Sequence, residues 1–189
     1  AERLEDYAPH ALDAYDSKNS GDVEYKEGIF VGYRWFDKEG VKPLFPFGYG
    51  LGYSSFSFGK VEASSATVRM TSREVAPDFA SEKKAGNGNS IKFRVDVTNT
   101  GNCRAAETVQ LYVRDMESSL PRPLKELKAF RKVWLDAGQT ETVELTLSEK
   151  DLRFFDDSKH KWVEEPGDFQ ALIGTSSEDI FIIVDFRLK

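Results

Sequence analysis

The sequence has one cysteine, Cys103, and only two histidines among its 189 residues. A lone cysteine excludes an internal disulfide, and no histidine or acidic partner stands near it at metal-ligand spacing. Nucleophilic catalysis by serine or cysteine needs a histidine base, yet His10 lies in a loose opening stretch and His160 in a turn-prone one. The sequence therefore predicts no metal site, no cofactor and no catalytic residue in this chain.

The chain also lacks a long apolar run and an excess of positive charge. No stretch approaches the roughly 20 apolar residues of a transmembrane helix, and the formal net charge is -6. Nucleic-acid binding depends on clustered basic residues that neutralise phosphates. We predict neither a membrane span nor a nucleic-acid partner. The one local basic cluster has strand spacing and is interpreted as a solvated face; it consists of Lys125, Lys128, Arg131 and Lys132.

Acidic residues are plentiful, at 32, so pairs of carboxylates are easy to find. Acid–base hydrolysis needs two carboxylates facing a substrate across roughly 5 to 10 Å, one of them with a shifted pKa. Adjacent acids do not by themselves indicate such a site, and we interpret them as solvated turns or sheet faces. The pairs are Glu24 with Glu27, Asp156 with Asp157, and Glu164 with Glu165.

The first 56 residues differ in composition from the rest. Residues 1–24 are poor in apolar residues and predict a surface excursion. Residues 23–36 are rich in aromatic and β-branched residues, which predicts a strand followed by a turn at 37–40. Residues 43–56 are dense in aromatics, glycine and proline, which favours an irregular, buried connection. Their three glycines do not indicate a phosphate loop, because no helix pattern follows.

From residue 58 onward the pattern is one of short strands and turns. Apolar and polar residues alternate, as in Ile91, Phe93, Val95 and Val97, which predicts one buried and one wet face per sheet. Seven to nine strands over about 130 residues predict a mainly β, immunoglobulin-like antiparallel sandwich, with a mobile loop at 77–89. The strand candidates are 58–64, 66–73, 90–98, 107–115, 125–135, 140–147, 161–163, 167–174 and 180–188.

The tryptophans admit two interpretations. Flat rings can stack on sugars, and Trp35, Trp134 and Trp162 are the candidates for such a surface. All three stand in strand-like runs, where a tryptophan usually fills a core, so we favour core positions. Trp162 is the weakest case because charged residues surround it.

Two groups of motifs resemble a known family. EGIFVGYRWFD (27–37) followed by PLFPFGYGLGYSSF (43–56) is similar to the end of the α/β sandwich domain of family 3 glycoside hydrolases. VTNTG (97–101), VQLYV (109–113), RPLKELKAF (122–130) and DLRFFD (151–156) resemble the fibronectin type III-like domain that follows it. The resemblance covers about nine-tenths of the chain. The departures at Gly52, Ala106 and Ala129 concern packing and turns.

The resemblance implies a function and a domain layout. Family members are retaining, exo-acting enzymes that remove a terminal β-linked sugar, usually glucose, with a nucleophilic Asp in an N-terminal barrel and an acid/base Glu in the α/β sandwich domain. Neither motif is present here, so no catalytic residue carries over. Residues 1–57 would be the tail of the α/β domain and 58–189 the fibronectin type III-like sandwich.

On this view the chain braces its partners, the barrel and α/β domains of the same enzyme, through which it serves a β-glucoside substrate. A secreted or periplasmic location is favoured by the family. The alternative is a non-catalytic β-sandwich module that binds carbohydrate or another surface; it requires exposed, roughly coplanar aromatic rings.

Overall fold

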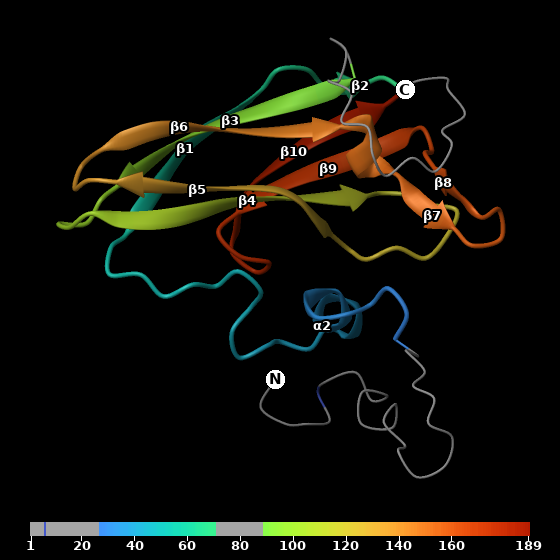
Figure 1. Cartoon of the computed structure of the whole chain (residues 1–189), viewed down its shortest axis with the longest axis horizontal. Helices are drawn as coiled ribbons and strands as arrows, with labels where there is room; N and C mark the ends of the chain where they lie inside the picture. Colours follow the sequence, from blue (N-terminus) through green and yellow to red (C-terminus); the bar gives the residue numbers. More distant parts are fainter. Residues whose placement is uncertain (1–5, 7–26, 71–88) are drawn as a thin grey trace.

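A computed structural model describes residue 6 and residues 27–70 and 89–189. The predicted surface excursion at 1–24 and nearly all of the predicted loop at 77–89 therefore lie outside the described residues. Ten strands and a short α-helix form the described part of the chain (Figure 1). They are α2 (Tyr33–Glu39), β1 (Phe56–Ala63), β2 (Thr67–Val68), β3 (Ser90–Asn99), β4 (Ala105–Asp115), β5 (Glu126–Leu135), β6 (Thr140–Ser148), β7 (Phe154–Asp156), β8 (Lys161–Val163), β9 (Gly167–Gly174) and β10 (Ile180–Leu188).

Two sheets face each other. One has the order β1-β3-β6, and the other has the order β2-β10-β9-β4-β5, while β7 and β8 pair as a small separate hairpin (Figure 1). The pairings are antiparallel except for β2 with β10. The predicted mainly β, immunoglobulin-like sandwich is confirmed.

The core lies between the sheets, where the alternating residues meet. Phe93 and Val95 of β3 are at most 1% exposed. Across the core, Phe169 and Phe186 stack with ring centroids 5.6 Å apart. Alternation gives each of these strands one apolar face, and apposing the two faces removes both from water, which is the main stabilising term of the fold.

The predicted strand at 23–36 is wrong in its described part. Residues 27–29 form a turn and residues 33–39 form α2. Gly28 and Gly32 have φ angles of 57° and 60°, which an extended strand does not accommodate. Gly40, with φ 65°, ends the helix in the left-handed conformation, so residues 37–39 are the end of a helix, not a turn. Tyr33 contacts the sandwich at Tyr112, while Phe30 and Trp35 lie beside Lys38 of the same helix, so aromatic composition does not by itself indicate a strand.

Residues 43–55 are irregular, as predicted, but the prediction that this connection is buried is wrong. Leu44, Phe45 and Tyr49 are 65%, 62% and 52% exposed. The segment lies under the sandwich as a layer, next to α2, before it rises into β1 (Figure 1). Its aromatic composition alone did not reveal which side would face water.

Smaller differences concern strand ends. Within the described part of the predicted strand at 66–73, β2 (Thr67–Val68) is the strand that forms, and residues 71–73 lie outside the described residues. The β7 strand and the preceding 3-10 turn (Glu149–Leu152) were not predicted. A capping box between Ser148 and Asp151 starts that turn.

Candidate docking site

Strand β4 is buried on both faces over part of its length. Val109, Leu111 and Val113 point into the core, but Gln110 and Tyr112 between them are also at most 3% exposed. Alternate residues of a strand point to opposite faces of the sheet. The outer face of this sheet is therefore covered at its centre. The cover consists of α2 and of residues 42–55, and we call residues 42–55 the strap.

Helix α2 packs on the sheet through Tyr33. Its ring meets Tyr112 edge-on at 5.8 Å and Phe47 of the strap at 5.1 Å between centroids. Its hydroxyl oxygen accepts a hydrogen bond from the backbone N–H of Leu127 at 2.9 Å. Edge-to-face pairs favour one orientation, and the hydrogen bond fixes the depth at which the helix sits.

Asp37, four residues on, lies on the same face of the helix and forms the second attachment. Its Oδ1 is 2.7 Å from the Lys125 ammonium nitrogen, and the two side chains are only 5% and 14% exposed. Arg34 reaches Glu126 at 3.4 Å. A largely buried pair of this kind restricts the geometry of the helix more than an exposed one.

Arg122 organises the connection between β4 and β5. Its guanidinium contacts Asp115 at 2.8 Å and Glu126 at 2.7 Å. Burial raises the pKa of Asp115, and Arg122 opposes this effect. Burial also acts to raise the pKa of Glu126, but Lys128 and Arg122 outweigh it and leave that pKa lowered. The cluster thus keeps Glu126 charged where it faces Arg34 of α2.

The basic cluster was predicted to be a solvated face, and this holds only in part. The Lys125 and Lys128 side chains are 14% and 17% exposed and are paired with acids. Burial lowers the pKa of Lys128, against the effect of Glu126. Arg131 and Lys132 are exposed on β5. Strand spacing could not show that α2 and the β4–β5 connection would cover the first two lysines.

Gln110 anchors the strap at Gly48. Its side-chain amide donates to the carbonyl oxygen of Gly48 at 3.3 Å and to that of Thr175, while its oxygen accepts from the Tyr112 hydroxyl at 2.5 Å. Gly48 has φ 79°, and a Cβ there would overlap the Gln110 amide. Burial, with Tyr33 and Asp37 nearby, raises the pKa of Tyr112, so it stays a neutral donor.

Asn99, in the VTNTG motif, anchors the far end of the strap. It is fully buried, and its amide donates to the carbonyl oxygens of Cys103 at 2.8 Å and Leu135 at 2.9 Å. Its oxygen accepts from the Ser54 hydroxyl at 2.6 Å and the Gly101 N–H at 3.0 Å. One side chain therefore joins strap, turn and strand.

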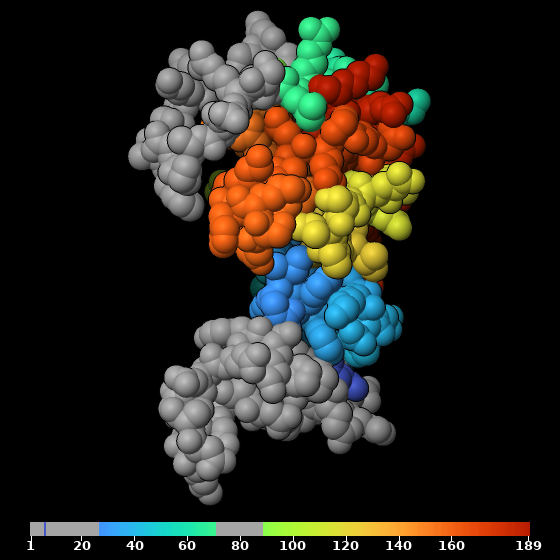
Figure 2. Space-filling model, turned by 90° about the vertical axis from the view of Figure 1, so that its right-hand side faces the viewer, coloured from blue at the N-terminus to red at the C-terminus, as the bar shows by residue number. Residues whose placement is uncertain are grey.

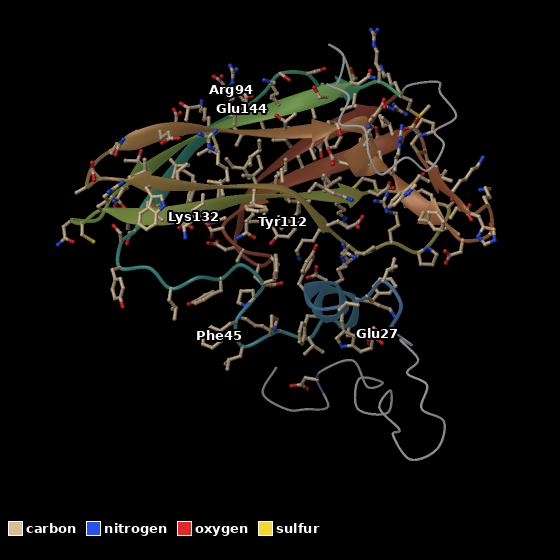
Figure 3. The ribbon with its side chains drawn as sticks, viewed as in Figure 1. Glu27, Phe45, Arg94, Tyr112, Lys132 and Glu144 are labelled. Atoms are coloured by element: carbon tan, nitrogen blue, oxygen red, sulfur yellow. The ribbon has the colours of Figure 1, made fainter. Side chains whose placement is uncertain are left out.

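The other side of the strap is apolar and open. Leu51 and Tyr53 are 87% and 97% exposed, and Figure 3 shows Phe45 directed away from the sheets. Figure 2 shows the strap and α2, in blue, as a layer beneath the strands. A row of exposed apolar side chains on a firmly attached backbone is the form of a protein interaction surface.

The tryptophans do not occupy the predicted core. Trp134 and Trp162 are 58% and 51% exposed, and Trp35 is half-buried on α2. Phe155 lies beside Trp162 with a ring angle of 74°. The prediction of core positions is therefore wrong for Trp134 and Trp162. Trp134 stands on the outer face of β5, and Trp162 lies on the β7–β8 hairpin, outside the two sheets that enclose the core.

The paired carboxylates serve separate neighbours. Asp156 is 3% exposed and accepts hydrogen bonds from Ser158 and Lys159, which lower its pKa. Glu164 pairs with Arg153, and Glu165 accepts from Ser119. These acids therefore hold turns and connections together. Of the remaining candidates, Asp157 and His160 are exposed in the turn after β7, and Glu27 precedes α2. Glu24 and His10 lie outside the described residues.

Within residues 27–70 and 89–189, no group of three or more His, Cys, Asp or Glu residues is arranged to hold a metal. Nor is any helix of that part long and apolar enough to cross a membrane. The absence of catalytic, cofactor and metal residues remains a prediction from the sequence. What the described residues do build is the attached strap with its open apolar side.

Comparison with known proteins agrees with this arrangement. Residues 107–177 match the fibronectin type III-like domain family. A β-glucosidase of Bacteroides ovatus is 44% identical over 87% of this chain. A thermostable β-glucosidase of Acetivibrio thermocellus is 42% identical over 88% of it. The chain spans only about a fifth of the length of these curated relatives, 20% in each case.

The solved structures give the same result. A β-glucosidase from Kluyveromyces marxianus in complex with glucose is 37% identical, has a TM-score of 0.70, and is matched over 89% of this chain and 18% of its own. This chain belongs to the family 3 glycoside hydrolases. A family 3 β-glucosidase from Bifidobacterium adolescentis, 32% identical with a TM-score of 0.76, is matched over 94% of this chain and 23% of its own. The chain corresponds to the C-terminal part of these family 3 enzymes.

Proposed function

We propose that this chain is the non-catalytic C-terminal part of a β-glucosidase that hydrolyses terminal β-D-glucosyl residues with retention, and that it braces the catalytic domains. The observation that carries the proposal is the strap. Its inner side is fixed to the sandwich by Gln110 and Asn99, while Leu51, Tyr53 and Phe45 stand open on its outer side. A rigid scaffold with an open apolar side is suited to hold a second body in place.

Bracing would matter for chemistry because a retaining mechanism tolerates little error in the position of its two carboxyl groups. Those groups would come from the barrel and the α/β domain, which are the proposed partners. The chain itself would contact the β-glucoside only through them. We also propose a domain boundary between residues 57 and 58, with the tail of the α/β domain before it and the fibronectin type III-like sandwich after it. Side chains of residues 33–55 nevertheless attach this tail to the sandwich, as Tyr33 and Ser54 do.

Hydrolysis of an aryl β-glucoside tests the proposal. We expect no activity from this chain alone, and activity when it is mixed with the N-terminal remainder of its parent enzyme. Replacing Phe45 and Tyr49 by alanine should reduce activity in the mixture, with unchanged thermal unfolding of the chain itself. Activity of the chain alone, or a folded mixture that stays inactive, would contradict the proposal.

A carbohydrate-binding module is the second candidate, favoured by the exposure of Trp134 and Trp162. Such modules need rings that present one flat platform. Phe155 and Trp162 instead meet at 74°, and Trp134 has cations over its ring. Retardation of the chain in gels containing soluble β-glucan would support this second candidate.

A further inference from the structure

A second apolar row lies outside the strap, on β5. Phe130, Lys132 and Trp134 alternate along the strand and so share its outer face, while Val133 and Leu135 between and beyond them are buried in the core. Phe130 is 67% exposed and Trp134 is 58% exposed. Two large rings on an uncovered sheet face are more than the scattered exposure of a normal surface.

Both ends of this row are linked to the strap through neighbouring residues of the sandwich. Phe130 pairs in register with Gln110, whose amide holds the Gly48 carbonyl. At the other end, the Arg104 guanidinium lies 5.9 Å from the centre of the Trp134 ring. The preceding residue, Cys103, contacts the Tyr53 carbonyl through its sulfur at 3.5 Å. Gln110 at one end, and Arg104 with Cys103 at the other, therefore connect the β5 row to Gly48 and Tyr53 of the strap.

The opposite sheet has nothing comparable. Among the described residues, the large hydrophobic side chains with high exposure all lie outside β1, β3 and β6. Charge also differs along the row, because Arg104 and Lys132 both stand near the Trp134 ring, with Lys132 at 5.5 Å. The outer face of β5 is thus apolar with two cations around Trp134. Lys132, labelled in Figure 3, stands between the two rings, and Arg104 also pairs with Asp136 at 3.5 Å.

We infer that the outer face of β5 and the open side of the strap form one docking surface for the rest of the same enzyme, with acidic groups of that partner facing Arg104 and Lys132. This inference rests on the proposed function. The links between the row and the strap, and the four-fifths of the relatives' length that the match does not cover, favour this occupant. A second copy would bring the same cations against each other, and a sugar would need a free Trp134 face.

The test measures association of this chain with the N-terminal remainder of its parent by titration calorimetry. We expect the double variant Phe130→Ala and Trp134→Ala to weaken binding at least tenfold, since large aromatic anchors dominate interfaces. Trp162→Ala is the matched control, because Trp162 has similar exposure but lies on the separate β7–β8 hairpin. Its affinity should stay within about twofold. The thermal unfolding of each variant alone shows whether it is folded.

Lys132→Glu is the second variant and does not remove apolar area. It should weaken binding more at low salt than at high salt, because it reverses the charge that faces the partner's acids and salt screens the resulting repulsion. Unchanged affinity of both β5 variants, alongside a loss in Phe45→Ala, would overturn this inference and leave the proposed function standing. No association of the unsubstituted chain would remove both. Dimerisation lost in the β5 variants, or glucan retardation lost in them, would also overturn it.

Discussion

The two outer faces of the sandwich are built on opposite plans. On the β1-β3-β6 sheet, Lys92 and Arg94 both bind Glu144, at 2.7 and 2.9 Å, and their side chains are 48%, 57% and 30% exposed (Figure 3 labels Arg94 and Glu144). On the other sheet, the corresponding face carries Tyr112, which is fully buried beneath Tyr33 of α2. One face satisfies its polar groups by itself, and the other needs a cover. The covered face is the one on which we propose that the chain docks with the rest of its enzyme.

The difference teaches that an antiparallel sandwich sets its core and its interaction surface separately. Both sheets give the core similar alternating apolar residues, so the inward faces carry no information about partners. The outward faces do. On the β1-β3-β6 sheet, paired charged side chains form the surface that meets solvent. On the other sheet the strap covers the outer face, and the exposed apolar side chains belong to the strap.

Tyr112→Ala should have the largest effect on this contrast. The substitution removes the ring on which Tyr33 packs and leaves the Gln110 oxygen without its donor. We expect a loss of roughly 3–5 kcal/mol in the free energy of unfolding, as for other buried aromatic truncations. Urea unfolding followed by circular dichroism measures it. Ile183→Ala, at a position 57% exposed, should change stability by less than about 0.5 kcal/mol, and equal losses would mean that the cover contributes nothing.

Asn99→Ala should come next. It leaves the buried Leu135 carbonyl and the Ser54 hydroxyl without their partner. Unpaired buried polar groups cost about 1–3 kcal/mol, and we expect about 2 kcal/mol by the same urea titration. Ser54→Ala removes one of the four hydrogen bonds and should cost about 1 kcal/mol. An Asn99→Ala protein as stable as Ser54→Ala would show that Asn99 holds only the strap.

The pair Asp37 and Lys125 tests the attachment of α2. In a double-mutant cycle with Asp37→Asn and Lys125→Met, we expect a coupling energy of about 1 kcal/mol, in the range found for contacting charges. Amide hydrogen exchange in α2 reports it, because loss of the pair should free the helix before it unfolds the sandwich. If the sandwich strands exchange faster to the same extent, the helix is part of the core and not an added cover.

The sandwich was predictable because alternation is a direct record of burial. Ile91, Phe93 and Val143 alternate with polar residues, and only a strand with one buried face produces that period. Gly167–Gly174 and Ile180–Leu188 were placed at their observed bounds. The family resemblance added the order of the pieces and placed the chain in its enzyme.

The docking site was harder to predict because its residues have no period. Tyr33 and Asp37 are four apart, a helical signal, but the β-branched and aromatic composition around them favoured a strand. In the structure, Gly28 and Gly32 have positive φ angles, which fit a turn followed by a helix and not a strand. Trp134 illustrates the second difficulty. An alternating run predicts that one face of the strand is buried, but it does not show whether Trp134 lies on that face. The pairing of β5 with β4 shows that Trp134 lies on the outer face.

Glu144→Gln should have the smallest effect and defines the polar face. Hydrogen bonds from Lys92 and Arg94 lower the pKa of Glu144 from its ordinary value of 4.5. A lowered pKa in the folded state means that the native protein binds this proton less readily than the unfolded chain does. The carboxylate therefore adds stability above pH 4.5, and this contribution is lost as pH falls through the lower folded value.

The stability difference between Glu144→Gln and the unsubstituted chain should accordingly be small at neutral pH, shrink as the pH falls below 4.5, and shrink also in 1 M salt, because exposed pairs are screened. Thermal unfolding at several pH values measures it. Asp37→Asn is the comparison, because the ion pair of Asp37 with Lys125 lies between α2 and the sandwich. The stability change that it causes should depend less on salt. If Glu144→Gln proved the costlier of the two and insensitive to salt, the β1-β3-β6 face would itself be a covered surface, and the contrast between the two faces would fail.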